Sequence, residues 1–274
     1  MRTLVIGGTG TIGSAVASAC ADRRFPHLVT SYREAANTTP LDVRDDDAVR
    51  ELIADYQPDV TVYAAPSDDR AGVENVVRAV RDGTGVLVAF TPTAVFGGGM
   101  KFAREDDPID PTADPAHAHL ESTLRTHLPE RHLLLRTCTV YGPNTRGLVG
   151  KLTRRLGRLE TVHRDESRIA MPTYAPDLAE VAFDLLKHGY VGTVHAVGPD
   201  RSSAFTFARL AAHLFGYDAD LVQPRAAVDR PTRVTIDRTR LRALLGPNAI
   251  RNVADGLRAV RNETAGARRI PVAA

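Results

Sequence analysis

A run of glycines near the start of the chain has the spacing of a phosphate-binding loop. The run, Gly7-Gly8-Thr9-Gly10-Thr11-Ile12-Gly13, follows a short apolar segment and leads into a stretch of helical periodicity. Glycine lets the backbone turn tightly and approach a pyrophosphate, and the amino-terminal end of a helix offers unpaired N–H groups. In this strand–turn–helix context the spacing predicts a dinucleotide site. We expect its phosphate contacts to come from Gly7, Gly10, Thr11, Ile12 and Gly13.

The residues after the next predicted strand bear on the choice between NAD(H) and NADP(H). An acid about 20 residues beyond the glycines would bind the ribose 2′-hydroxyl of NAD, but this strand ends in Ser31, Tyr32 and Arg33. Hydroxyl groups and a guanidinium suit a 2′-phosphate, so the sequence favours NADP(H). The alternative is that Arg33 is a solvated loop residue, because arginine is common on protein surfaces.

Two histidines near the start of a later helix could act as acid or base, because imidazole titrates near pH 7. They are His117 and His119, and Asp114 is the expected N-cap of their helix. His117 stands four residues before Glu121, which predicts a shared face that we interpret as solvated. Imidazoles two positions apart on a helix point in different directions, so we expect no metal site.

A basic group recurs at helical spacing further along the chain. It consists of Lys151, Arg154, Arg155 and Arg158. These side chains could clamp a diphosphate. The alternative is an ordinary solvated basic face.

Continuous apolar segments alternate with helical patterns along most of the chain. The predicted strands are 4–6, 27–30, 59–64, 85–90, 133–135 and 193–197. The predicted helices are 12–22, one through 49–53, 73–80, one starting at 115, 178–186 and 204–215. Continuous apolar strands that alternate with helices indicate an α/β protein whose parallel sheet is covered on both faces.

The bulk composition excludes several other classes. The chain has 274 residues and a formal net charge of +2, too balanced for nucleic acid to be the main partner. It lacks a run of about 20 apolar residues, so we expect no membrane span, and a buried strand pattern directly after Met1 leaves no room for a signal peptide. The two cysteines, Cys20 and Cys138, are far apart in sequence, which favours a reduced, cytoplasmic protein.

Several motifs resemble those of the extended short-chain dehydrogenase/reductases, the NAD-dependent epimerase/dehydratase superfamily. They are the glycine spacing, Leu41-Asp42-Val43-Arg44-Asp45, Leu135-Arg136-Thr137-Cys138-Thr139-Val140-Tyr141-Gly142-Pro143, the segment 172–179, the segment 192–195 and Arg230-Pro231. The resemblance spans residues 1–262. Within the superfamily the chain is most similar to the dTDP-4-dehydrorhamnose reductases and the related regulatory β subunits of methionine adenosyltransferase.

The resemblance implies a Rossmann-type doubly wound parallel sheet with a small C-terminal substrate lobe. It implies a Rossmann domain of residues 1–143 and 172–197, a substrate lobe of 144–171 and 198–264, and a tail of 265–274. It also implies a nucleotide-linked sugar or similar small polar metabolite as substrate, and a homodimer is a further expectation. Additional cofactor contacts are expected from Asp42, Val43, Ala64, Ala65, Thr91 and His119. Substrate contacts are expected from Thr93, Thr139, Tyr141, Arg168 and Tyr174.

The catalytic residues of this superfamily are Ser or Thr, Tyr and Lys, and this chain differs from that pattern at all three positions. Alignment on Leu120 puts Pro115 at the tyrosine and His119 at the lysine, and the strand-end motif puts Pro92 at the hydroxyl residue. The candidate replacements are His117, His119, Thr93 and Tyr141. We expect His119 to inherit the inward-facing position as acid or base, the alternative being a ribose-contacting or merely packed histidine.

Three functions fit this combination of a retained glycine loop and a lost catalytic motif. The first is an NADP(H)-dependent reductase or epimerase with a non-standard acid/base residue. The second is a non-catalytic, NADP(H)-sensing regulatory subunit. The third is a lyase, isomerase or cyclase that keeps the dinucleotide for structure or for transient oxidation.

Overall fold

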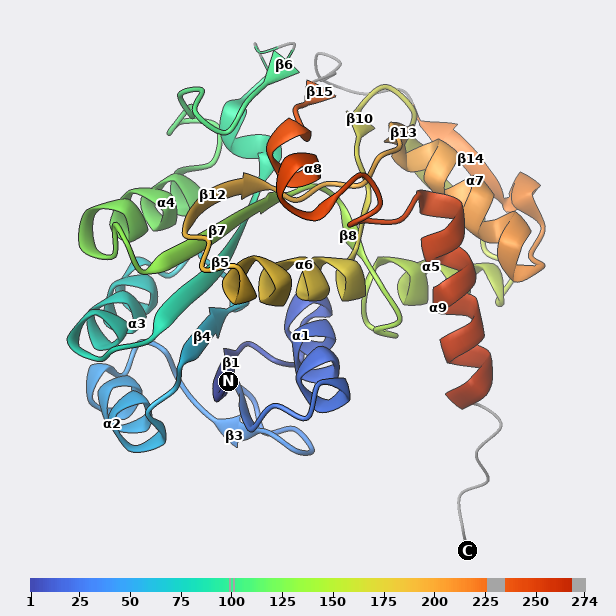
Figure 1. Ribbon diagram of the computed structural model, residues 1–274. Coiled ribbons are helices and arrows are strands. Elements are labelled where there is room, and N and C mark those ends of the chain that lie inside the picture. Colours follow the sequence, from blue (N-terminus) through green and yellow to red (C-terminus); the bar gives the residue numbers. More distant parts are fainter. Residues whose placement is uncertain (99, 101, 226–234, 268–274) are drawn as a thin grey trace, which may run out of the picture.

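A parallel β-sheet forms the centre of the molecule (Figure 1). The computed structural model describes residues 1–98, 100, 102–225 and 235–267, and within them the sheet has seven strands in the order β12-β7-β5-β4-β1-β2-β3, every pair parallel. The strands are β1 (Thr3–Ile6), β2 (His27–Ser31), β3 (Thr39–Pro40), β4 (Val60–Tyr63), β5 (Val86–Pro92), β7 (His132–Thr137) and β12 (Gly192–His195). The predicted α/β fold with a parallel sheet is confirmed.

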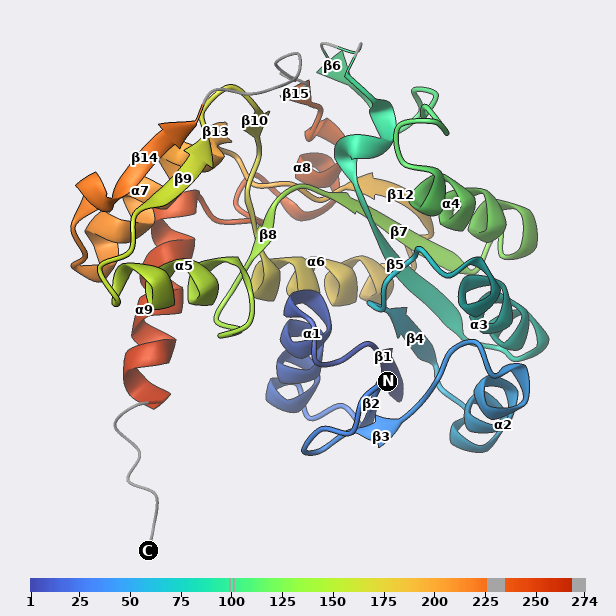
Figure 2. The same ribbon diagram turned by 180° about the vertical axis from the view of Figure 1, so that it is seen from behind.

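Helices cover both faces of this sheet, as Figures 1 and 2 show from opposite sides. One layer consists of α1 (Thr11–Asp22) and α6 (Ala175–Lys187), and the other of α2 (Asp46–Tyr56), α3 (Arg70–Asp82) and α4 (Pro115–His127). Successive residues of a strand point to opposite faces. Val5 of β1 therefore packs into the core with α1 and α6, while its neighbours Leu4 and Ile6 pack into the core with the other layer.

A second group of elements lies beside the carboxyl edge of the sheet, on the right in Figure 1. It contains α5 (Leu148–Leu156), α7 (Ala204–Phe215), α9 (Val253–Ala267), β9 (Val162–Asp165) and β14 (Val222–Arg225). Its apolar side chains, among them Leu152, Phe207 and Leu257, form a core of their own. We call this group the second lobe.

The remaining elements are short. They are a 3₁₀ turn η1 (Thr93–Phe96), β6 (Phe102–Ala103), β8 (Val140–Tyr141), β10 (Ile169–Ala170), β11 (Thr173–Tyr174), β13 (Ser202–Ser203), η2 (Ala219–Leu221), β15 (Thr235–Ile236) and α8 (Thr239–Leu245). The predicted domain boundaries stay a prediction. One detail differs from them, because Leu241 of α8 packs in the core under α6 although residues 198–264 were expected in the substrate lobe.

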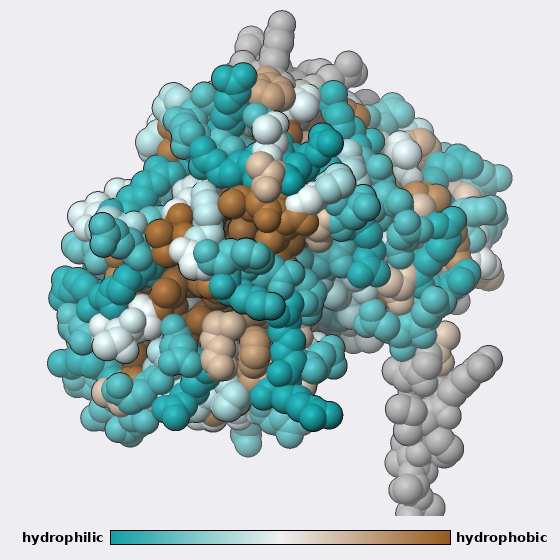
Figure 3. Space-filling model, viewed as in Figure 1, coloured by the Kyte–Doolittle hydropathy of each residue, from teal (hydrophilic) through white to brown (hydrophobic). Residues whose placement is uncertain are grey.

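The surface is polar over most of its area. Apolar side chains gather near the middle of the face shown in Figure 3, in the region of α6 and α8, with polar side chains around them. Across the described residues, every helix is too short or too polar to cross a membrane. Those residues also bring together no cluster of three or more His, Cys, Asp or Glu side chains suited to a metal ion.

Candidate cofactor and substrate site

The glycine loop joins β1 to α1. Two of its glycines lie so close to neighbouring backbone atoms that a side chain would not fit. Gly7 has φ +87°, and a Cβ there would lie 2.6 Å from the amide nitrogen of Ala65, in the turn after the adjacent strand β4. At Gly13 a Cβ would overlap the carbonyl oxygen of Gly7 and lie 2.8 Å from the Cα of Gly8. Gly13 thus lets α1 pack directly against the loop, as expected of a dinucleotide-binding turn.

The amino-terminal end of α1 is left without a side-chain cap. Its N-cap residue is Gly10, no side chain accepts a hydrogen bond from the first turn, and that turn holds no acidic residue. A Cβ at Gly10 would meet its closest neighbour, the Gly7 oxygen, at 3.4 Å, which is an ordinary van der Waals contact. Uncapped N–H groups and the positive end of the helix dipole make this end a site for an anion.

A cavity of about 810 Å³ opens in front of the glycine loop, and we call it the glycine-loop cavity. Its lining includes the predicted residues Gly7, Gly10, Ser31, Tyr32, Asp42, Val43, Ala64 and Ala65. Four chain segments supply them: the loop itself, the end of β2, the turn after β3 and the turn after β4. The structure therefore brings most of the predicted cofactor residues together. Their contacts with a cofactor stay a prediction.

At the β2 end of this cavity the charged side chain is Arg44 rather than Arg33. Arg44 binds both carboxylate oxygens of Asp42, which lowers the pKa of that carboxyl, and it donates to the Tyr32 hydroxyl at 3.2 Å. Arg33 is exposed and does not line the cavity. The hydroxyl of Ser31 is occupied, since it donates to the Arg33 carbonyl at 2.6 Å. No local pattern in the sequence indicates that the loop folds Arg44 back onto Tyr32.

A second cavity, of about 450 Å³, lies between the β4–α3 turn and the start of α4, and we call it the α4 cavity. It shares Ala64, Ala65, Pro66 and Asp68 with the glycine-loop cavity, so the two adjoin. Ile12 from the first turn of α1 lines its wall, as predicted for a cofactor contact, whereas Thr11 faces the loop around Gly147.

His117 lines the α4 cavity, together with Asp114 and Phe90. Asp114 caps α4 as predicted, accepting the His117 backbone N–H at 3.2 Å, and its two carboxylate oxygens each lie 2.9 Å from the ring nitrogen Nδ1. Our interpretation of His117 as a solvated partner of Glu121 is wrong. Glu121 is fully buried and binds Arg136 instead.

His119 does not face either cavity, which corrects the role predicted for it. Its Nε2 atom is buried against α3, 3.2 Å from Glu74 Oε1 and without a hydrogen bond among the described residues. The alignment on Leu120 placed His119 at the lysine position, but Glu121 fixes the rotation of α4 by reaching β7. Residues 117 and 121 lie one turn apart on one face, so His117 lies on the inward side of the helix.

Thr91 is also turned away from the cofactor cavities, contrary to the prediction. It is buried, and its hydroxyl donates to Glu121 Oε1 at 2.8 Å. The Arg136 side chain donates to both oxygens of the same carboxylate, at 2.9 and 2.7 Å. Thr91 therefore helps to fix α4 on the sheet.

Two tyrosines predicted to contact substrate belong to the core of the second lobe. Tyr141 is fully buried, stacks edge-on against Phe207, and directs its hydroxyl toward the Val253 carbonyl at 3.4 Å. Tyr174 is 1% exposed and donates to Glu263 at 2.7 Å. Burial raises the pKa of both phenols. Neither hydroxyl has access to a substrate, so the catalytic and substrate-binding roles predicted for them are corrected.

The remaining predicted substrate residues are dispersed. Thr93 opens η1 at the end of β5 and is half-buried, and Arg168 is exposed in the turn between β9 and β10. Thr139 is exposed where the chain passes from β7 to β8, with φ +42°, an unusual conformation for a β-branched residue. Neither cavity at the glycine loop contains any of the three, and their substrate contacts stay a prediction. The matched pair Arg230-Pro231 lies outside the described residues.

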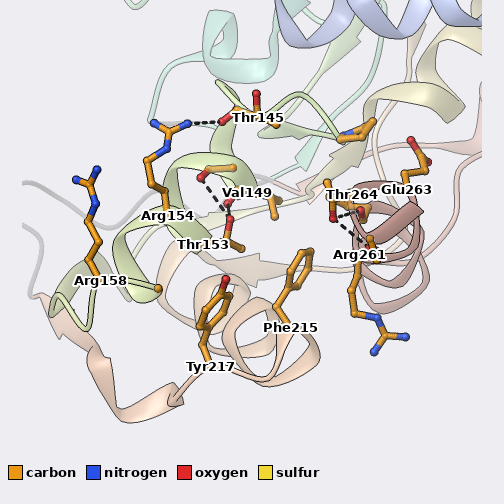
Figure 4. Close-up of a pocket in the computed structure, with 15 residues that line it drawn as sticks. Thr145, Val149, Thr153, Arg154, Arg158, Phe215, Tyr217, Arg261, Glu263 and Thr264 are labelled. Atoms are coloured by element: carbon orange, nitrogen blue, oxygen red, sulfur yellow. Dashed lines mark hydrogen bonds between the residues drawn. The ribbon is translucent and has the colours of Figure 1, made fainter. Parts of the chain in front are cut away.

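The second lobe holds a further cavity of about 940 Å³ between α5, α7 and α9 (Figure 4). Of the basic helical group, Arg154 and Arg158 line it, and Arg154 donates to the Thr145 carbonyl. Arg155 instead pairs with Glu160 at 2.8 Å. Two of the four basic side chains therefore line one cavity, and the diphosphate clamp stays a prediction.

The chain is similar to several known proteins in sequence and in structure. A dTDP-4-dehydrorhamnose reductase of Streptomyces griseus is 27% identical to this chain over 272 residues, 88% of the chain and 87% of the relative. The solved dTDP-4-dehydrorhamnose reductase of Bacillus anthracis in complex with NADP superposes with a TM-score of 0.83 at 18% identity, covering 96% of this chain and 99% of that one. The Bordetella bronchiseptica enzyme WbmH in complex with NAD+ gives a TM-score of 0.82 at 18% identity and 99% coverage of each chain.

The structural likeness extends over nearly the whole chain and confirms the Rossmann-type fold. The sequence match is equally broad, because the family model described as RmlD substrate binding domain matches residues 1–260. This chain belongs to the RmlD substrate binding domain family.

Proposed function

We propose that the protein is a nicotinamide-dinucleotide-dependent reductase that acts on the keto group of a nucleotide-linked deoxysugar, with NADP(H) preferred over NAD(H). The observation that carries this proposal is the pair of adjoining cavities along the glycine loop, which share one wall. A dinucleotide has two halves joined by a pyrophosphate. The uncapped end of α1 stands where the pyrophosphate would lie, with a cavity on either side of it.

The residues of the glycine-loop cavity suit the adenosine half. Gly7 and Gly10 leave room for the phosphates, and Val43 and Tyr32 offer apolar surface for a base. The residues at the end of β2 include no acid to meet a ribose 2′-hydroxyl. Elsewhere the cavity lining holds three aspartates, Asp42, Asp68 and Asp69, and two arginines, Arg44 and Arg146. A 2′-phosphate would be favoured by these guanidinium groups, which supports NADP(H).

The residues of the α4 cavity suit the reacting half. When bound, the reduced nicotinamide would supply a hydride for the substrate carbonyl. Ile12 and Phe90 give the cavity two apolar walls, and His117 provides a titratable group in the same space. The names of the relatives, dTDP-4-dehydrorhamnose reductase among them, support a dTDP-linked 4-keto-6-deoxysugar as the substrate class. A cytoplasmic location and a homodimer stay predictions.

The test is turnover by the purified protein. NADPH oxidation should depend on an added dTDP-4-keto-6-deoxysugar, and calorimetry should show tighter binding of NADPH than of NADH. Omission of the sugar is the control for background oxidation. Tight NADPH binding without turnover of any nucleotide-linked ketosugar would favour the sensing subunit, and absence of dinucleotide binding would refute the proposal altogether.

A further inference from the structure

Reduction of a ketone requires a proton donor. Pro115, which the alignment predicts at the tyrosine position of the superfamily, has no proton to transfer. The α4 cavity is lined by five side chains that could in principle exchange a proton, namely Tyr63, Ser67, Asp68, Asp114 and His117. Resting on the proposed function, we infer that His117 is the catalytic acid of the reduction and that Asp114 is its positioning residue.

The other groups of the α4 cavity are unsuited to the task. Tyr63 is buried, its hydroxyl donates to the Pro66 carbonyl at 2.9 Å, and burial raises its pKa. Ser67 is 6% exposed, and an aliphatic hydroxyl is a weak acid without a neighbouring base. Carboxyl groups are ordinarily ionised at neutral pH and have no proton to give. An imidazole changes its protonation state in the working range of most enzymes.

Asp114 determines which nitrogen of His117 can serve the substrate. Both carboxylate oxygens lie 2.9 Å from Nδ1, so this nitrogen carries a proton and donates it to the carboxylate. The other nitrogen, Nε2, is therefore the one left to meet a substrate in the cavity. A base held in one orientation by a third group is the arrangement that general acid–base catalysis requires.

The helix that carries this pair is anchored at its first turns. Pro115 occupies the first helical position, where its fixed φ suits a helix start. One turn after His117, the Glu121 carboxylate binds Arg136 of β7 and Thr91 of β5, and all three side chains are buried. These contacts hold His117 over the carboxyl edge of the sheet, on the same side as Ile12 and the glycine loop.

The inferred step balances as follows. The carbonyl carbon gains the hydride that the dihydronicotinamide provides, and the carbonyl π electrons move to oxygen. That oxygen takes the proton from Nε2 of the His117 imidazolium, which becomes a neutral imidazole and regains a proton from water. Asp114 stays ionised throughout and stabilises the imidazolium.

The first test locates His117 without any turnover. Diethyl pyrocarbonate acylates accessible neutral imidazoles, and mass spectrometry assigns the modified residue. NADP+, with binding confirmed by calorimetry, should protect His117 at least tenfold in rate, while the exposed His188 is labelled equally with and without it. Binding of NADP+ without protection of His117 overturns this inference alone. Failure of NADP+ to bind overturns the proposed function and the inference with it.

The second test separates catalysis from binding. His117→Gln should lower ketosugar reduction by about 10²–10⁴-fold, the usual effect of a lost general acid, and leave NADPH affinity within twofold of wild type. His119→Gln is the matched control, two residues away and facing α3, and should keep wild-type turnover. Full activity in His117→Gln would refute the inference and leave the reductase function standing.

The positioning role of Asp114 has its own readout. Asp114→Asn retains a good N-cap, but its amide can donate to Nδ1 and so move the ring proton to Nε2. Nitrogen-15 spectra of the neutral His117 ring should show the Nδ1–H form in the wild type and the Nε2–H form in the variant. An unchanged tautomer with reduced activity would show that Asp114 acts only as a helix cap.

Discussion

At the scale of single residues, two arginines compete for the role of 2′-phosphate ligand. Arg44 lines the glycine-loop cavity but already binds Asp42, whereas Arg33 is exposed outside the cavity and was the residue favoured by its place after β2. A surface arginine reorients easily, because its side chain has many rotamers. We therefore retain Arg33 as a predicted ligand and test it against Arg44.

Arg33→Ala is expected to weaken NADPH binding by about 1–3 kcal/mol, as for the loss of one charge-assisted hydrogen bond, and to leave NADH binding nearly unchanged. Arg44→Ala should affect both dinucleotides, since it also frees Asp42 at the cavity wall. Calorimetric titration of each variant with both cofactors distinguishes the two. A selective loss of NADPH affinity in Arg44→Ala alone would transfer the role to Arg44.

A buried histidine makes the stability of the protein depend on pH. The ring of His195 is fully buried, its Nδ1–H donates to the Asp237 carbonyl at 3.1 Å, and its backbone N–H donates to Glu105. Burial lowers the pKa of His195, more strongly than the Glu105 carboxylate raises it, and Arg136 lowers it further. The folded protein therefore keeps this ring neutral at a pH where the unfolded chain binds a proton.

The free energy of unfolding should consequently fall as the pH drops below about 6.5, the ordinary pKa of histidine, with His195 contributing a slope of at most about 1.4 kcal/mol per pH unit. Above that pH the contribution is constant. Urea unfolding between pH 5 and 8, a range of about three pH units around this value, measures the slope. His195→Gln should flatten it relative to wild type, while the exposed His188→Gln should not. A slope equal in all three proteins would contradict the prediction.

At the scale of elements, the strand–loop–helix unit at the start of the chain explains why some of the site was predictable. Gly7 and Gly13 lie so close to backbone atoms that only glycine fits. This steric requirement can be read from the sequence, because it determines the residue type. The sequence alone could not decide whether His117 or His119 faces the cavity. This depends on the rotation of α4, which is set by Glu121 meeting Arg136 from β7, a contact that local periodicity does not encode.

The same reasoning accounts for the other corrections. Tyr141 belongs to a motif that resembles those of the extended reductases. Whether its ring faces a ligand or a core depends on α7, which supplies Phe207 from 66 positions later in the sequence. Arg44 reaches Tyr32 through the shape of the loop after β2. Predictions from the sequence succeeded where the backbone dictated the residue and failed where distant elements determined the direction of a side chain.

Two glycine replacements separate the structural and the ligand-binding demands on this loop. Gly13→Ala should destabilise the fold, because its methyl group would overlap the Gly7 carbonyl and meet the Gly8 backbone. Gly10→Ala should leave the melting temperature nearly unchanged, since the closest atom to its methyl group is 3.4 Å away, and yet weaken NADPH binding at least tenfold by filling the phosphate space. Thermal melts and calorimetry check both. Wild-type affinity in Gly10→Ala would show that the pyrophosphate does not lie there.

At the scale of the whole molecule, an ion pair ties the second lobe to the layer of helices on the sheet. Asp177 near the start of α6 is 9% exposed at its side chain, and Arg251, just before α9, binds both of its oxygens. The Arg251 guanidinium also lies 4.6 Å from the centroid of the Tyr174 ring. The pair therefore joins α6, the lobe core and the C-terminal helix α9, which Figure 1 shows running downward in front of α5.

Loss of this pair should loosen the second lobe and spare the dinucleotide site. Arg251→Ala leaves the nearly buried Asp177 carboxylate without its partner, which should cost about 1–3 kcal/mol. Arg258→Ala is the matched control on the same helix, because its partner Asp255 is exposed and such surface pairs contribute about 0–1 kcal/mol. Hydrogen exchange should quicken in α9 but not in α1, and the KM for the sugar substrate should rise while NADPH affinity stays at the wild-type value. Equal acceleration in both helices would mean that the pair stabilises the whole fold rather than the position of the lobe.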